Sequence, residues 1–160
     1  MNQALLSSEK HDWQTPDCVL KLVRVVAGGE IALDPCTTAD NPCEAEEVIT
    51  PEEDGLELPW DTLGLVYVNP PYGAIKTWAE KILEESIDAE IIALVPARTE
   101  TKWFCQLVWE GADACCFWKG RLTFKGAPSS APFPSAVAYY GPRPAFFEYV
   151  FARAGRVVRL

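Results

Sequence analysis

A short segment, Asn69-Pro70-Pro71-Tyr72, follows an apolar run over residues 64–68 that is typical of a buried strand. Each proline fixes its backbone φ angle and donates no hydrogen bond, so the carbonyl groups of Asn69 and Pro70 should be held in fixed directions. The Asn69 side-chain oxygen and the Pro70 carbonyl could then each accept one proton of an NH2 group. Such a pair would draw the nitrogen towards a tetrahedral shape and expose its lone pair to an electrophilic methyl group.

This arrangement suits an aromatic amine such as the exocyclic nitrogen of adenine, whose lone pair is delocalised into the ring. No strong base is required, because the amino proton becomes acidic only after methyl transfer. Tyr72, two residues after Pro70, could stack on a base that has left a double helix. The alternative is a proline-rich turn that only caps the strand. The strand before the segment and the helix expected after it favour the chemical interpretation.

The elements that must position this segment are short apolar strands alternating with amphipathic helices. We expect strands at 30–33, 48–50, 64–68, 91–95, 114–118, 135–140 and 156–160, and helices at 17–27, 75–86, 101–110 and 144–153. This alternation predicts an α/β fold with a mostly parallel central sheet covered by helices on both faces. Such sheets bind ligands at the carboxyl ends of their strands. Because Asp34-Pro35-Cys36 follows the first strand, the site should lie between this turn and residues 69–72.

The composition agrees with one globular domain, since 160 residues with 49% hydrophobic residues can build a core. No apolar run is long enough to cross a bilayer and no signal peptide is recognisable, so we expect a cytoplasmic protein. The six cysteines form no CxxC pair, and His11 is the single histidine. We therefore expect buried, reduced thiols and no metal site.

The net charge of −9 argues against a nucleic-acid partner. However, the acidic residues are concentrated in residues 40–61, which contain no lysine or arginine, whereas residues 119–125 and 143–159 are basic. This uneven distribution is compatible with one positive face.

Residues 69–72 resemble the catalytic motif of methyltransferases that act on amino groups. Several further motifs follow one another in the chain, each of them weak alone. They are Asp12-Trp13-Gln14-Thr15-Pro16, Asp34-Pro35-Cys36, Asp54-Gly55-Leu56 with Trp60, Leu94-Val95-Pro96-Ala97-Arg98-Thr99-Glu100-Thr101 with Trp103-Phe104, Gly120-Arg121-Leu122 with Phe124, and Ala131-Pro132-Phe133-Pro134-Ser135. In their order and spacing, residues 12–140 resemble the phage-type DNA N-6-adenine methyltransferases (Dam-like).

The resemblance implies a Rossmann-like, S-adenosylmethionine-dependent methyltransferase fold in one compact domain, residues 1–160. We expect no separate target-recognition domain and a flexible segment at residues 1–11. The resemblance makes Asn69, Pro70, Pro71 and Tyr72 the catalytic residues. The residues that it places at the cofactor, S-adenosylmethionine, are Trp13, Thr15, Pro16, Asp34, Pro35, Cys36, Asp54 and Leu56.

Within the cofactor site, Asp34 would lie near the methionine ammonium group and Asp54 near the adenine. An acidic residue should hold the ribose hydroxyls, and several remain open candidates. They are Glu46, Glu47, Glu52 and Glu53. The chain departs from many such sites in one respect, because the turn after its first strand contains no glycine.

The partner implied is DNA, with the target adenine flipped out of the duplex, in a bacterial cell and of phage or prophage origin. A role in restriction–modification fits this origin. The residues expected to contact DNA are Arg98, Thr99, Lys102, Arg121 and Phe124. The alternative is that the aromatic residues of this region belong to the core, which we expect for Trp118 and Phe133.

Other functions remain open. Asn-Pro-Pro-Tyr also resembles the motif of methyltransferases that act on RNA bases or on protein glutamine. Those enzymes would carry a glycine-rich first loop, which is absent here. A third possibility is a catalytically inert DNA-binding module built on the same fold.

Overall fold

The computed structural model describes residues 13–160 of the chain, so Asp12, His11 and the segment 1–11, which we expect to be flexible, lie outside the described residues. The helical elements are α2 (Asp17–Ala27), the 3-10 turn η2 (Tyr72–Ala74), α3 (Ile75–Glu85), α4 (Lys102–Phe104), the π-helical η3 (Cys105–Glu110) and α5 (Pro144–Phe151). The strands are β1 (Leu33–Asp34), β2 (Glu47–Val48), β3 (Leu65–Val68), β4 (Glu90–Pro96), β5 (Ala114–Trp118), β6 (Ser135–Tyr140) and β7 (Gly155–Arg159).

The seven strands form one sheet in the order β2-β1-β3-β4-β6-β5-β7. Strands β2, β1, β3 and β4 pair in parallel, whereas β6 is antiparallel to both of its neighbours and β7 is antiparallel to β5. The prediction of a mostly parallel sheet is therefore wrong, and the sheet is mixed. The cause is the connection over residues 119–134, which contains no helix. Parallel neighbours need a long crossover, so without one the chain turns back from β5 and enters β6 in the opposite direction.

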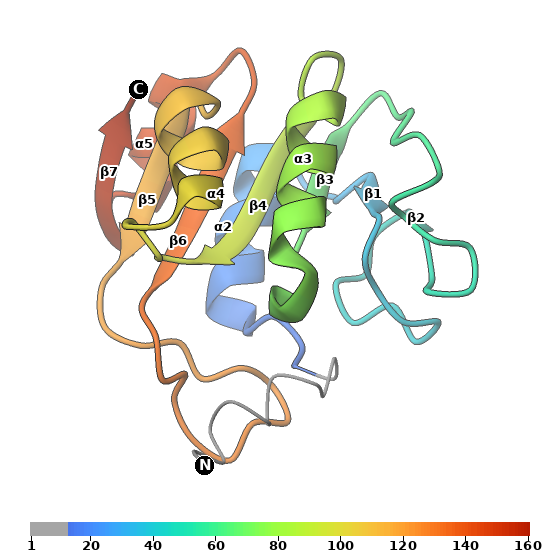
Figure 1. Cartoon of the computed structure of the whole chain (residues 1–160), viewed down its shortest axis with the longest axis horizontal. Coiled ribbons are helices and arrows are strands. Elements are labelled where there is room, and N and C mark those ends of the chain that lie inside the picture. The colour runs from blue at the N-terminus through green and yellow to red at the C-terminus, as the bar shows by residue number, and fades with distance from the viewer. Residues whose placement is uncertain (1–12) are drawn as a thin grey trace.

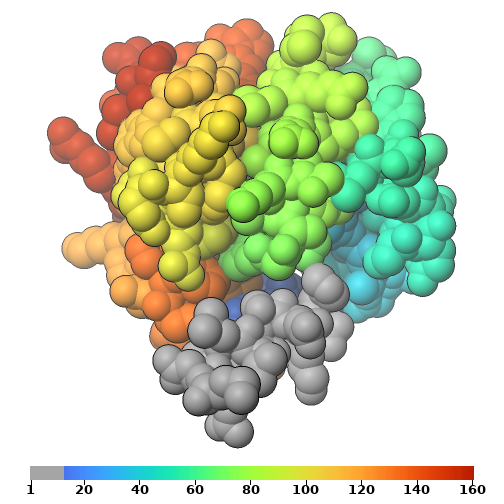
Figure 2. All heavy atoms as spheres, in the orientation of Figure 1, coloured from blue at the N-terminus to red at the C-terminus, as the bar shows by residue number. Residues whose placement is uncertain are grey.

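Helices cover both faces of the sheet. In Figure 1, α3 and α4 lie in front of the strands, and α2 and α5 lie behind them. Figure 2 shows α3 (green) and the segment 102–110 (yellow) side by side on the front face. Alternate residues of β3 point to different sides, since Leu65 and Tyr67 join the core beneath α2 and α5, whereas Val66 and Val68 join the core beneath α3. Burial on both faces explains why this strand is apolar throughout.

Local signals explain the ends of several elements. Helix α2 begins after Pro16, which occupies the N-cap position, and ends at Gly28, whose φ of 83° is left-handed. The helix expected over residues 101–110 is present, but it begins as α4 and widens into the π-helical η3. Within residues 13–160, no helix is long and apolar enough to cross a membrane.

Candidate active site

A cavity of about 900 Å³ lies at the carboxyl ends of β1 and β3. Two turns border it, Asp34-Pro35-Cys36 after β1 and Asn69-Pro70-Pro71-Tyr72 after β3. The turns come together because β1 and β3 are parallel neighbours, with Leu33 opposite Val66. The structure thus brings to one cavity two polar turns that are 35 residues apart in the chain, counted from Asp34 to Asn69.

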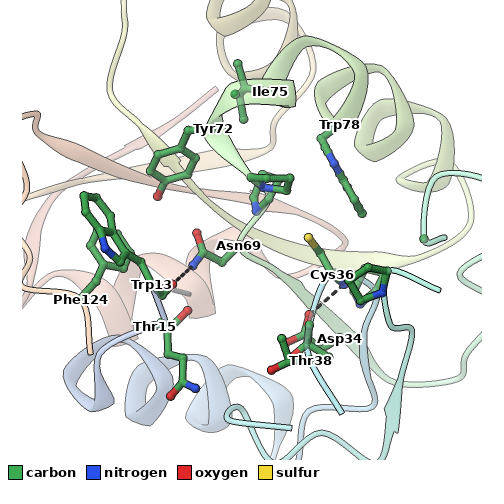
Figure 3. Close-up of a pocket in the computed structure, with 18 of the residues that line it drawn as sticks. Trp13, Thr15, Asp34, Cys36, Thr38, Asn69, Tyr72, Ile75, Trp78 and Phe124 are labelled. Atoms are coloured by element: carbon green, nitrogen blue, oxygen red, sulfur yellow. Dashed lines mark hydrogen bonds between the residues drawn. The ribbon is translucent and has the colours of Figure 1, made fainter. Parts of the chain in front are cut away.

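Asn69 lies in the middle of the cavity wall (Figure 3). Its side-chain Nδ2 donates a hydrogen bond to the backbone carbonyl of Trp13 at 3.4 Å. This contact occupies the nitrogen end of the amide, so Oδ1 is the end left for a ligand. The carbonyl of Pro71 accepts a bond from the Ala74 amide at 3.0 Å, but no backbone amide of residues 13–160 is bonded to the carbonyl of Pro70. Two acceptors, Asn69 Oδ1 and the Pro70 carbonyl, are therefore available at the end of β3.

Aromatic rings form one side of the cavity (Figure 3). Trp13 stacks on Phe124, with ring centroids 5.9 Å apart and planes 21° apart. Tyr72 meets Phe124 and Phe133 edge-on, at 6.4 Å and 5.3 Å. The hydroxyl of Tyr72 is buried and has no hydrogen-bond partner among residues 13–160. An aromatic wall of this kind can receive the flat ring of a base.

The aromatic side depends on the loop over residues 119–134, which supplies Phe124 and Phe133. This loop is attached to the start of the described chain, because the Lys125 amide donates to the Gln14 carbonyl at 2.9 Å. The Lys125 ammonium also lies 2.5 Å from the Asp17 carboxylate. Phe124 is only 2% exposed, so most of its surface supports its aromatic neighbours rather than facing solvent.

The opposite side of the cavity contains the carboxylate of Asp34, which is only 3% exposed. The backbone amide of Cys36 donates to its Oδ1 at 3.1 Å. Burial raises the pKa of Asp34 from 3.8 to about 6, although hydrogen bonds from Cys36, Cys43 and Thr37 partly oppose this shift. A buried carboxylate without a cationic partner in a cavity is suited to receive a cation. Burial also raises the pKa of the Cys36 thiol to about 12, so this thiol stays protonated at neutral pH.

Gly55 lies directly against the turn after β1. A β-carbon at this position would stand 1.9 Å from the Pro35 carbonyl oxygen, which is far inside contact distance. The adjoining Asp54 has a left-handed φ of 63°, and its carboxylate accepts a bond from the Leu56 amide at 3.0 Å. Glycine at position 55 thus allows the loop after β2 to pack directly on the turn after β1.

We expect Gly55→Ala to damage this half of the cavity. The added methyl group must push the loop away from Pro35, because the atom that it meets belongs to the backbone. The free energy of unfolding should fall by about 1–3 kcal/mol, and a cofactor that binds between the two segments should bind more weakly. Thermal unfolding and isothermal titration measure the two effects.

Gly73→Ala is the matched control for stability, since nothing lies within 4 Å of its added β-carbon. Equal stability of the two variants would contradict the prediction.

Of the eight residues expected at the cofactor, all except Pro16 line the cavity. Thr15 borders the cavity, and its hydroxyl lies 2.8 Å from that of Tyr67. Pro16 is buried at the start of α2 and does not line the cavity. The remaining ones all line it. They are Trp13, Asp34, Pro35, Cys36, Asp54 and Leu56.

None of the four candidate ribose acids lines the cavity, namely Glu46, Glu47, Glu52 and Glu53. A different carboxylate, that of Asp40, does line it. Asp40 accepts hydrogen bonds from the Thr38 hydroxyl and, at 3.4 Å, from the Gln14 side chain. Its signal in the sequence was its position within the loop that follows the first strand.

The residues expected to contact DNA are also divided. Arg98 and Phe124 line the cavity, whereas Thr99, Lys102 and Arg121 lie outside it and are exposed. Trp118 and Phe133, which we expected in the core, are both half-buried, and Phe133 lines the cavity.

All six cysteines are free, but only Cys43, Cys115 and Cys116 are buried. Across residues 13–160, no three His, Cys, Asp or Glu side chains are grouped so that they could hold a metal ion.

A polar and aromatic cavity at the carboxyl ends of parallel strands is the usual place for a nucleotide or another small molecule in an α/β enzyme. The comparison with protein families agrees with this class and narrows it. The model of the family DNA N-6-adenine-methyltransferase (Dam) matches residues 2–137, so the chain belongs to this family. The resemblance recognised in the sequence is thereby confirmed, and the family identifies a methyltransferase of adenine in DNA. No curated protein matches the chain.

Proposed function

We propose that the protein transfers a methyl group from S-adenosylmethionine to the N-6 amino group of adenine in DNA, at a specific site. The observation that carries this proposal is that the turn at Asp34 and the turn at Asn69 border the same cavity. Its volume of about 900 Å³ lies at the upper end of the range for small-molecule sites, which is about 300–1,000 Å³. Two flat ligands, a nucleoside-like cofactor and a flipped base, can share such a space.

The residues on the Asp34 side fit the proposed cofactor. The buried Asp34 carboxylate, which has no cationic partner among residues 13–160, would receive the methionine ammonium group. Asp54 and Leu56 would lie at the adenine, and Trp78 provides an apolar wall beside them. Asp40, which also lines the cavity, would hold the ribose hydroxyls. When bound, S-adenosylmethionine supplies an electrophilic methyl group on a positively charged sulfur.

The residues on the aromatic side fit a purine. Trp13 and Tyr72 present ring surfaces at the cavity, and Asn69 stands between them and the cofactor side (Figure 3). Asn69 Oδ1 and the Pro70 carbonyl each accept one hydrogen bond from the adenine amino group. The nitrogen then directs its lone pair towards the methyl group. As the bond from nitrogen to the methyl carbon forms, the bond from that carbon to sulfur would break and leave a neutral thioether. The nitrogen, now positively charged, would release one proton to water.

Turnover of DNA is the direct test. The purified protein is incubated with S-adenosylmethionine carrying a labelled methyl group and with adenine-containing DNA, RNA or a glutamine peptide. We expect N-6-methyladenine in DNA alone, detected by mass spectrometry of the digested nucleosides. Label in RNA or peptide would instead favour the alternative substrates. No binding heat with S-adenosylmethionine or its demethylated product would favour an inert module.

Site selection is proposed to come from short loops. The segment over residues 119–134 is the main candidate, since it borders the cavity through Phe124 and Phe133 and carries the exposed Arg121. DNA modified by the protein can be digested with methylation-sensitive nucleases, which would reveal the recognised sequence. A phage or prophage origin and a bacterial cytoplasmic location complete the proposal.

Tyr72 provides a prediction about the ring itself. Its hydroxyl has no partner among residues 13–160, so Tyr72→Phe should keep most of the activity. Tyr72→Ala removes the stacking surface. It should reduce transition-state stabilisation by about 1–3 kcal/mol, which lowers kcat/KM roughly 5- to 150-fold. Steady-state kinetics with one DNA substrate compare the two variants. Equal losses would show that the hydroxyl, and not the ring, makes the important contact.

A further inference from the structure

The basic residues of this acidic chain gather near its carboxyl end. Residues 111–160 contain only two carboxylate side chains, Asp113 and Glu148, and both have partners. Asp113 accepts a hydrogen bond from the Gly141 amide at 2.7 Å, and Glu148 lies 3.0 Å from Arg159. The basic residues of this segment are Lys119, Arg121, Lys125, Arg143, Arg153, Arg156 and Arg159. Four of them form no ion pair within residues 13–160, namely Lys119, Arg121, Arg153 and Arg156.

Three of these unpaired residues, Lys119, Arg153 and Arg156, line one shallow surface hollow of about 500 Å³. We call these three residues the basic hollow. No acidic residue lines it, since its other walls are Phe117, Ala152 and Gly155. The sheet holds its parts together, because the Lys119 amide bonds to the Ala154 carbonyl at 3.0 Å. Three cations without a local counter-charge repel one another, and an anion bound between them would relieve this repulsion.

The basic hollow and the cavity lie at the same edge of the sheet, the edge at which β1, β3, β4 and β5 end. β5 runs in the same direction as β4, since both are antiparallel to β6, and Lys119 directly follows the carboxyl end of β5. Lys119 is five residues from the cavity-lining Phe124, a distance of at most about 17 Å along extended chain. This length corresponds to about five base pairs of DNA, at 3.4 Å for each step. In Figure 2, the orange loop and the red carboxyl-terminal atoms lie along one side of the molecule.

We infer that the basic hollow binds the phosphate backbone of DNA within about five base pairs of the target adenine. This inference rests on the proposed function and adds a second contact region to it. Phosphate contacts of lysine and arginine fix the position of a duplex without reading its sequence. The exposed Arg121, which lies between Lys119 and Phe124 in the chain, extends the positive path from the basic hollow towards the cavity.

A purely structural role predicts something different. Arg153 follows the end of α5, where a cation stabilises the helix dipole, and Arg156 lies on the edge strand β7, where charge prevents association with other strands. Loss of these roles would lower stability or solubility. It would leave the affinity for DNA unchanged.

The test replaces Lys119, Arg153 and Arg156 together by alanine in the full chain. Fluorescence anisotropy with a labelled 24-base-pair duplex, a length of roughly two turns, is measured over a series of salt concentrations. We expect binding at least about tenfold weaker and a salt slope smaller by about 2–3. KM for DNA should rise while kcat at saturating DNA and the affinity for S-adenosylmethionine stay unchanged.

Arg159→Ala is the matched control. It removes one charge from the same strand, but its guanidinium is already paired with Glu148, and its side chain points to the opposite face from that of Arg156. We expect a nearly unchanged salt slope for this variant. A loss for each removed charge that is equal in the two proteins would instead attribute the effect to general charge.

The outcomes separate the two proposals. A triple variant that binds and methylates DNA like the wild type would overturn the inference that the basic hollow binds DNA. It would leave the proposed function intact. A wild-type protein that binds S-adenosylmethionine but no DNA overturns both. Should thermal unfolding show that the triple variant does not fold, the exposed Lys119→Gln replaces it. Its salt slope should then fall by about 1, and an unchanged slope would contradict the inference.

Discussion

Asn69→Ala is expected to lower the rate constant of methyl transfer by at least about 10²–10³-fold, as the loss of one preorganised catalytic hydrogen-bonding group does elsewhere. The structural reason is that Asn69 supplies one of the two acceptors at the end of β3, with its amide nitrogen held by the Trp13 carbonyl. The affinity for S-adenosylmethionine should stay nearly unchanged, because the role proposed for Asn69 is at the amino group and not at the cofactor. Single-turnover methylation and isothermal titration measure the two quantities.

The control for this variant is Gln106→Ala, which removes an exposed amide from η3 that does not line the cavity. It should be fully active. Stability does not confuse the comparison, since the single 3.4 Å hydrogen bond of Asn69 contributes about 1 kcal/mol or less. An Asn69→Ala protein with wild-type activity would refute the catalytic role of Asn69.

Asp34→Asn is expected to make the protein more stable at neutral pH. The pKa of Asp34 is about 6 in the folded chain, against 3.8 as the ordinary value, because the carboxyl group is buried. The folded state therefore binds its proton more tightly than the unfolded state does. The stability from this difference is fully present below pH 3.8 and is lost as the pH rises through about 6. At pH 7.5 the charged group costs up to about 3 kcal/mol, which asparagine removes.

The same substitution should abolish tight binding of the cofactor, since asparagine has no charge to offer the methionine ammonium group. In the wild-type protein, the affinity for S-adenosylmethionine should fall as the pH drops below about 6, by up to about tenfold for each pH unit. Isothermal titration between about pH 5 and pH 8, a range that includes the Asp34 pKa of about 6, measures both effects.

The control for Asp34→Asn is Asp61→Asn, which changes the net charge equally at an exposed position outside the cavity. It should alter neither the melting temperature nor the affinity for the cofactor. A more stable Asp34→Asn protein that still binds S-adenosylmethionine normally would remove Asp34 from the cofactor site.

Much of the fold follows from local patterns that can be read along the chain. The apolar runs of β3 and β4 can be buried only on both faces, and the helix over residues 17–27 ends where Gly28 permits a left-handed conformation. The strand directions could not be derived in this way. They depend on whether a connection contains a crossover helix, and the absence of one in residues 119–134 reverses β6.

The cavity shows the same division. The amino-acid sequence by itself determined which turns carry polar groups, because two prolines after a strand and an aspartate at a strand end are local features of residues 34–36 and 69–72. Only the tertiary structure decided which distant residues join them. Gly55 meets Pro35, Asp40 borders the cavity while the four candidate glutamates do not, and Phe124 supports Trp13. Such contacts depend on the path of whole loops in space, which is set by packing across the sheet rather than by the residue types along one segment.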